Sequence, residues 1–204
     1  MFVCAGESEQ FDFAIPIGIG MTDVAINLTK LCLSQKPEFL FFVGTAGSYG
    51  EKKIFDIVES KTAANIENSF FNAKAYTPID NVISAYGTID VSRETREADD
   101  NSLSSEGLEP KWSERSGATQ AGETIVNSSN YITTDKSLGN AYVAKNIHIE
   151  NMEYYAVLKV AKHFGIPAAG VFIVTNYCDA NAHRDFLKNH KVAMEKLTHY
   201  IKEK

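Results

Sequence analysis

The sequence of 204 residues has few cysteines, no metal-binding pattern and no long apolar run. Its three cysteines, Cys4, Cys32 and Cys178, form no CxxC pair, which predicts free thiols in a reducing cytoplasm. The five histidines form no HxxxH or Cys/His cluster, so we expect no metal site. The longest apolar runs, FLFFV (39–43) and AAGVFIV (168–174), are too short to cross a bilayer.

Basic residues are also scarce. The chain has 20 Lys and Arg against 26 Asp and Glu, a formal net charge of −6 and a pI of about 5.4. It contains no basic stripe or polybasic run, so we expect no nucleic-acid partner and no membrane partner. The start, MFVCAGESEQ, lacks the basic segment and cleavage site of a secretory signal. With 44% hydrophobic residues, the length predicts a single globular domain over residues 1–204.

Apolar runs alternate with segments of helical period, which predicts an α/β protein. The run 168–174 is continuously apolar, as expected of a parallel strand that helices cover on both faces. We therefore expect a three-layer α/β/α sandwich with a central, mostly parallel or mixed sheet. Strands are predicted at 13–17, 39–43, 54–58, 147–149 and 168–174. Helices are predicted after a cap at Thr22 or Asp23, from Asp135 to about Lys145, around Ala156–Phe164 and over 182–202, the last with Phe186, Ala193, Leu197 and Ile201 on one side.

One polar segment interrupts this alternation. Residues 90–124 are rich in charged and small residues without a sustained apolar period, and they include the only tryptophan, Trp112. This composition predicts an insertion or a long mobile loop. An active-site lid is the functional alternative.

Two glycine-containing segments are candidate anion sites. VGTAGSYG (43–50) follows a predicted strand, where small residues let a ligand approach free backbone N–H groups. IGIGMTD (17–23) places Gly20 near a helix N-terminus, where a phosphate is stabilised. Neither segment is a Walker loop, and Gly18-x-Gly20 lacks the third glycine of a dinucleotide fingerprint. From VGTAGSYG alone a tight turn is the favoured interpretation, and IGIGMTD has the same ambiguity.

The order of several short motifs is more specific than any one of them. IGIG precedes a helix, a strand and GTAG, and SSNYIT, NME at the head of a helix and TN at a strand end follow much later. This order resembles the nucleoside phosphorylase and nucleosidase superfamily over residues 1–75 and 123–200, most closely its short bacterial purine nucleoside phosphorylases. The resemblance implies a nucleoside phosphorylase-like fold, a dimer-based homo-oligomer, and no cofactor, with a purine nucleoside and phosphate as co-substrates.

The resemblance also implies roles for individual residues. Glu153 would accept hydrogen bonds from the ribose hydroxyls, and Asn176 would contact the purine, with a preference for 6-oxopurines; these two are the expected catalytic residues. The alternatives are a helix-dipole carboxylate at Glu153, a turn residue at Asn176 and a core aromatic at Tyr131. The other implied site residues are Met152 against the sugar, Tyr131, Ile132 and Thr175 beside the base, and Gly20, Thr45, Ala46 and Gly47 on the phosphate or nucleophile side.

The sequence departs from the family pattern at the nucleophile. Phe42 stands where hexameric phosphorylases carry a phosphate-site arginine, and Asn151 replaces the first glutamate of Glu-Met-Glu. Glu7 or Glu9 matches the glutamate that activates water in nucleosidases. The leading hypothesis is a purine nucleoside phosphorylase, with Arg93, Arg96 or a neighbouring subunit supplying the missing charge. The alternatives are a hydrolytic purine nucleosidase and a catalytically weak nucleoside-binding homologue.

Overall fold

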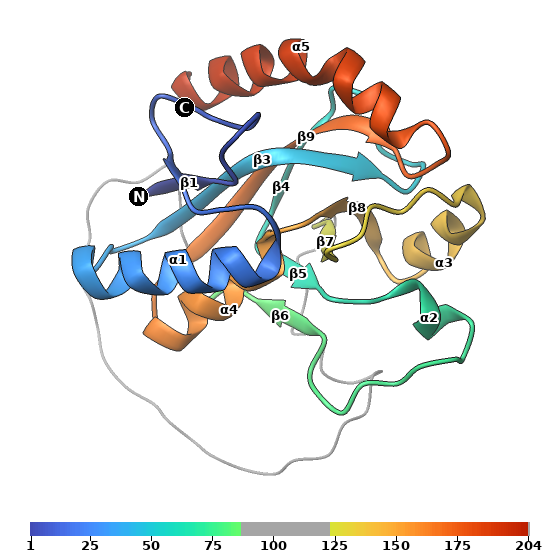
Figure 1. The fold of residues 1–204 in the computed structure, drawn as a ribbon, viewed down its shortest axis with the longest axis horizontal. Helices are drawn as coiled ribbons and strands as arrows, with labels where there is room; N and C mark the ends of the chain where they lie inside the picture. The colour runs from blue at the N-terminus through green and yellow to red at the C-terminus, as the bar shows by residue number, and fades with distance from the viewer. Residues whose placement is uncertain (87–122, 204) are drawn as a thin grey trace.

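A nine-stranded sheet forms the centre of the computed structural model, which describes residues 1–86 and 123–203 (Figure 1). Within these ranges, no helix has the length and apolarity needed to cross a membrane. The strands are β1 (Phe2–Cys4), β2 (Ile15–Pro16), β3 (Leu40–Ser48), β4 (Ile57–Ser60), β5 (Thr62–Ala64), β6 (Val82–Ser84), β7 (Ile125–Ser128), β8 (Ile147–Asn151) and β9 (Ala168–Tyr177). The helices are α1 (Gly20–Gln35), α2 (Asn68–Phe71), α3 (Gly139–Val143), α4 (Tyr154–Phe164) and α5 (Ala182–Lys202), with a 3₁₀ turn at Lys136–Leu138.

The sheet is mixed and mostly parallel. Its main path runs β2-β1-β3-β8-β7-β5-β6, and β9 pairs with β3 in parallel and with β4 antiparallel. Along one edge of β3, β1 pairs near its start and β8 near its end. The long strands β3 and β9 therefore form the middle of the sheet, and their carboxyl ends lie together.

Helices cover both faces of the sheet, as Figure 1 shows with α5 on one side and α1 and α4 on the other. Side chains of β3 and β9 alternate between the two faces, as a strand requires. Leu40 and Phe42 pack with α1 and α4, whereas Phe41 and Val43 pack in the cluster that contains Ala193 of α5. The prediction of a three-layer α/β/α sandwich is confirmed.

Several predicted boundaries were wrong. The strand expected at 39–43 continues to Ser48, because β9 and β8 pair with its glycine-containing end. The helix expected after a cap at Thr22 or Asp23 begins at Gly20, and Ile19 precedes it without a side-chain cap. The helix predicted from Asp135 to about Lys145 is instead a 3₁₀ turn, in which Asp135 accepts from the Ser137 N–H, followed by the short α3. The last helix matches its predicted range of 182–202.

The polar segment lies almost wholly outside the described residues. Only 123–124 of the predicted insertion at 90–124 are described, and Trp112, Arg93 and Arg96 are not. The insertion, the lid alternative and the single-domain assignment therefore stay predictions. At the described end, Thr124 is buried and leads directly into β7.

Candidate active site

A cavity of about 290 Å³ opens where the carboxyl ends of β3, β8 and β9 meet the starts of α4 and α5. Ligand sites of α/β proteins lie at such strand ends. Residues from seven segments line it: Ala5, Gly6, Ser8 and Glu9; Ile19; Thr45, Ala46 and Gly47; Ser129, Tyr131 and Ile132; Glu150, Asn151, Met152 and Glu153; Asn176; and Ala182, His183 and Phe186.

Glu153 is the most buried carboxylate of this cavity. It directly precedes α4 and is 4% exposed, and its Oε1 accepts a hydrogen bond from the Gly20 N–H at 2.9 Å. Burial and then the negative charge of Glu9 raise the pKa of Glu153 to about 7, while the Gly20 hydrogen bond opposes that rise. Near neutral pH both the protonated and the ionised form of this carboxyl group are therefore populated.

The N-terminus of α1 is already occupied by the protein's own acceptors. The Gly20 N–H binds Glu153, and the Met21 N–H binds Oδ1 of Asn130 at 3.0 Å. Gly20 has a φ of +78°, and a Cβ there would stand 2.9 Å from that same Asn130 oxygen, so the position requires glycine. Gly20 does not line the cavity. The phosphate that the sequence suggested at this helix end would have to displace a buried carboxylate.

Glu9 is the second acidic group, and it is held by Thr45 at the carboxyl half of β3. The Thr45 N–H donates to Oε2 of Glu9 at 3.0 Å, and the Thr45 hydroxyl donates to Oε1. Glu7, the other sequence candidate, is exposed and lies outside the cavity lining. The two candidates that the sequence left open are thus distinguished by the contact with Thr45.

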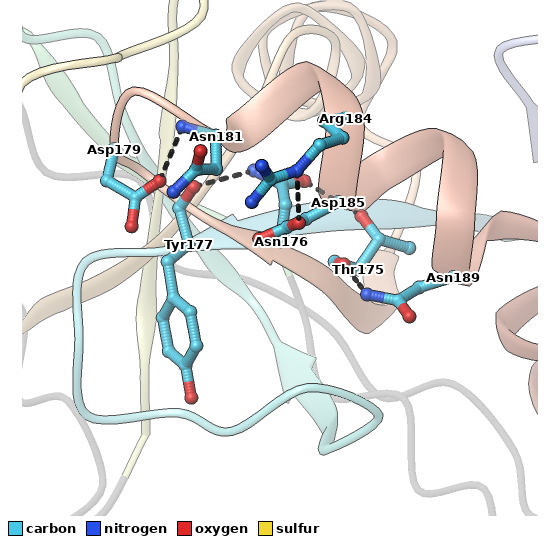
Figure 2. Close-up of polar contacts among 8 residues, drawn as sticks. All are labelled: Thr175, Asn176, Tyr177, Asp179, Asn181, Arg184, Asp185 and Asn189. Atoms are coloured by element: carbon cyan, nitrogen blue, oxygen red, sulfur yellow. Dashed lines mark hydrogen bonds and ion pairs between the residues drawn. The ribbon is translucent and has the colours of Figure 1, made fainter.

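Asn176 follows an irregularity in the pairing of β3 with β9. Ala46 pairs with Val174 and Gly47 with Asn176, so Thr175 is bulged out of the ladder. Figure 2 shows the end of β9 packed beneath α5, whose Asn189 donates to the Thr175 carbonyl at 2.8 Å. The Asn176 amide donates to the Tyr177 carbonyl at 3.1 Å and accepts from the Thr175 hydroxyl at 2.9 Å. One amide N–H thereby remains for a ligand.

The segment after β7 supplies two exposed apolar side chains to the cavity. Tyr131 is 78% exposed and Ile132 is 52% exposed, so Tyr131 is not a core aromatic. Hydrogen bonds from backbone N–H groups fix this segment at Tyr131 and just after Ile132. The Tyr131 N–H donates to the Ser129 hydroxyl at 3.1 Å, and the Thr133 N–H donates to the buried Glu150 carboxylate at 2.9 Å.

Most of the site residues predicted from sequence come together here. Gly20 and Thr175 lie outside the lining, and Phe42 is fully buried among Tyr154 and Phe172. Phe186, predicted on the inner face of the last helix, lines the cavity instead. The predicted residues that line it are Glu153, Met152, Tyr131, Ile132, Asn176, Thr45, Ala46 and Gly47.

Sequence reasoning missed several other lining residues that belong to no motif, among them Glu150 and His183. Three glutamates, Glu9, Glu150 and Glu153, line the cavity, and none of the described lining residues is Lys or Arg. Across residues 1–86 and 123–203, no group of three or more His, Cys, Asp or Glu side chains could hold a metal ion. The cavity therefore offers carboxylates, amides and apolar surface.

A comparison with protein-family models identifies the family. The model of the phosphorylase superfamily matches residues 6–203. Among curated proteins, none matches the sequence. Similar solved structures include Helicobacter pylori 5′-methylthioadenosine/S-adenosylhomocysteine nucleosidase with a bound ligand (TM-score 0.68, 16% identity, 93% of this chain and 77% of that one). Others are H. pylori futalosine hydrolase (0.66, 14%, 93% and 76%) and Streptococcus pneumoniae MTA/SAH nucleosidase with 8-aminoadenine (0.66, 12%, 98% and 97%).

Proposed function

The chain belongs to the phosphorylase superfamily, and we propose that it is a hydrolytic purine nucleosidase, which releases a free purine and ribose from its substrate. In the sequence analysis this function was the first alternative to the leading hypothesis, a purine nucleoside phosphorylase. One observation carries the proposal. The cavity holds Glu9, fixed by Thr45, together with the buried Glu153, and its described lining has no Lys or Arg.

Charge favours water over phosphate as the nucleophile. A phosphorylase must bind a phosphate anion, for which proteins use arginine, lysine or free backbone N–H groups. Here the first two N–H groups of α1, those of Gly20 and Met21, bind Glu153 and Asn130. Phe42, the residue at the expected arginine position, is in the core. Water carries no charge and needs only a base, which Glu9 supplies.

Each residue then has a defined part in breaking the N-glycosidic bond. Glu9 takes a proton from water as the oxygen attacks C1′ of the ribosyl group. Glu153 in its ionised form accepts hydrogen bonds from the ribose hydroxyls and balances the positive charge that develops on the sugar. The free N–H of Asn176 donates to the departing purine, which leaves with the bonding electron pair and takes up a proton from solvent. Tyr131 and Ile132 cover the base.

The similar structures give the proposal further support. Two of those described above are MTA/SAH nucleosidases, and one is a futalosine hydrolase. At 12–16% identity they establish the fold alone, and so they do not choose a substrate for this chain. A test panel should therefore contain adenosine, inosine, guanosine and 5′-methylthioadenosine.

The decisive experiment measures base release with and without phosphate, in water enriched in ¹⁸O. We expect release that does not depend on phosphate, with ¹⁸O at C1 of the ribose product. Glu9→Gln, which keeps the size of the side chain, should slow this release by at least about a hundredfold. Formation of ribose 1-phosphate that requires phosphate would identify a phosphorylase instead. Binding of nucleosides without any cleavage would support the weak-homologue alternative.

A further inference from the structure

Asn151 ends β8 and makes hydrogen bonds in two directions inside the site. Its side chain is 7% exposed. The Oδ1 atom accepts from the N–H groups of Glu153 at 2.9 Å and Tyr154 at 3.0 Å, at the start of α4. The Nδ2 atom donates to the carbonyl of Thr45 on β3 at 3.1 Å. One amide thus joins the segment that carries Glu153 to the strand that holds Glu9.

These contacts form a continuous path between the two carboxylates. Thr45 binds Glu9 through its N–H and hydroxyl, and it binds Asn151 through its carbonyl. Asn151 binds the backbone of Glu153, whose carboxylate then binds the Gly20 N–H. Thr45, Asn151 and Glu153 are all buried, so water competes little for these bonds.

We propose that Asn151 is a positioning residue that fixes Glu9 and Glu153 relative to each other. The proposal rests on the proposed function, in which these two groups act on water and on the sugar. Two like charges in a buried cavity repel each other, so their separation must be held by other contacts. An uncharged amide suits this position because it both donates and accepts. A carboxylate could accept the two N–H groups but could not donate to the Thr45 carbonyl.

The simpler role for Asn151 is to stabilise the start of α4. Serine and aspartate provide comparable acceptors at helix starts. Asn151→Ser and Asn151→Asp should therefore preserve that stabilisation, and both lose the amide donor to Thr45. Asn151→Ser adds no charge, which makes it the main test variant, and Asn151→Asp serves if the serine variant is poorly folded. Asn146→Ser is the matched control, because Asn146 donates to the Glu123 carbonyl at 2.9 Å before the opposite end of β8.

The test measures how strongly Glu9 acts on Glu153. The Glu153 carboxyl is titrated by ¹³C NMR, with Glu153→Gln used to assign its signal, in wild type and in Asn151→Ser, each with and without Glu9→Gln. In wild type, removing the Glu9 charge should lower the pKa of Glu153. In Asn151→Ser this effect should be clearly smaller, while Asn146→Ser should retain it in full. An equal effect in all three backgrounds would overturn the proposal and leave Asn151 as a helix cap.

Activity provides an independent readout. If the nucleosidase assay detects turnover, Asn151→Ser should lower kcat/KM by about tenfold or more, mainly through kcat, because a lost buried hydrogen bond misplaces the reacting groups. An unchanged kcat would argue against a positioning role. If no nucleoside is cleaved, the proposed function fails, whereas the titration still decides whether Asn151 sets the spacing of the two carboxylates.

Discussion

Glu153 lies buried in the same cavity as Glu9, and burial, followed by the negative charge of Glu9, raises its pKa to about 7. The two residues are far apart in the sequence, Glu9 before α1 and Glu153 directly before α4. A carboxyl group with such a pKa changes charge within the physiological range. We therefore expect both the activity and the stability of the protein to depend on the protonation of Glu153, whose pKa depends in turn on the charge of Glu9.

The activity should depend on the charge of Glu153. We expect kcat/KM to rise with pH to a plateau, with a midpoint near 7, because only the ionised form balances the developing ribosyl cation. Glu153→Gln should lower kcat/KM by roughly ten- to a hundredfold. The measurement is a pH profile of initial rates, with circular dichroism to show that the variant is folded. Unchanged kcat/KM in Glu153→Gln would place this residue outside the site.

The same group should make stability depend on pH. Its pKa is about 7 in the folded protein against an ordinary value of 4.5, so folding binds a proton between these values. This contribution is fully present below about pH 4.5 and is lost as pH rises through about 7. Relative to Glu153→Gln, the wild-type free energy of unfolding should fall by on the order of 3 kcal/mol across this range. Urea melts of both proteins at several pH values test this, and parallel pH curves would contradict it.

Glu9→Gln should have two separable effects. It removes the proposed base, so kcat for nucleoside hydrolysis should fall by at least about a hundredfold, within the range of general base catalysis. It also removes a neighbouring negative charge, so the pKa of Glu153 should fall. Glu7→Gln is the matched control, because Glu7 is exposed and does not line the cavity. Equal losses in both variants would exclude Glu9 as the specific base.

The parts of the fold that sequence predicted well are those with a strong local pattern. The run 168–174 and the helix over 182–202 have uninterrupted apolar or amphipathic character, and both form as predicted. The end of β3 was missed because Gly44 and Gly47 suggest a turn, whereas pairing with two other strands makes it continuous. Tertiary pairing overrides local preference at such positions.

The sequence predicted which residues line the cavity where short motifs preserve their order, as around Glu153 and Asn176. It was not predictable where distant segments decide the outcome. Gly20 looked like a phosphate site, but its N–H binds Glu153, which is far away in the chain. Likewise, the choice between Glu7 and Glu9 depends on Thr45, which no local pattern reveals. The structure thus differs from the sequence-based expectation where hydrogen bonds join segments that are distant in the chain.

The protein should form a homodimer. Ile26 and Leu33 of α1 are 49% and 63% exposed, and Ile19, which directly precedes the helix and also lines the cavity, is 40% exposed. Because the three are spaced seven residues apart, they form an apolar stripe along one side of α1 and its start. Exposed apolar surface of this kind marks interaction sites. Light scattering at micromolar concentration should give the mass of a dimer, and Ile26→Glu with Leu33→Glu should give a monomer with reduced activity. Leu187→Glu on α5 is the control, and a fully active wild-type monomer would refute the prediction.

Base choice should depend on Asn176. Its oxygen accepts from the Thr175 hydroxyl and one of its N–H groups binds the Tyr177 carbonyl, so a single donor remains for the base. A 6-oxopurine presents two neighbouring acceptors, N7 and O6, to such a donor. Adenine pairs its N7 acceptor with a 6-amino donor, which an N–H group opposes. We therefore expect inosine and guanosine to be cleaved in preference to adenosine.

Asn176→Asp should shift this preference toward adenosine, because a carboxyl group can accept from the 6-amino group and, when protonated, donate to N7. A polar mismatch in a buried site discriminates strongly, since it leaves groups unpaired, and Asn176 is only 7% exposed. The measurement is kcat/KM for inosine and adenosine in both proteins, with Asn181→Asp as a control for added charge near the start of α5. Asn181→Asp should leave the inosine-to-adenosine ratio unchanged. A wild-type preference for adenosine, or a ratio that Asn176→Asp leaves unmoved, would mean that another residue recognises the base.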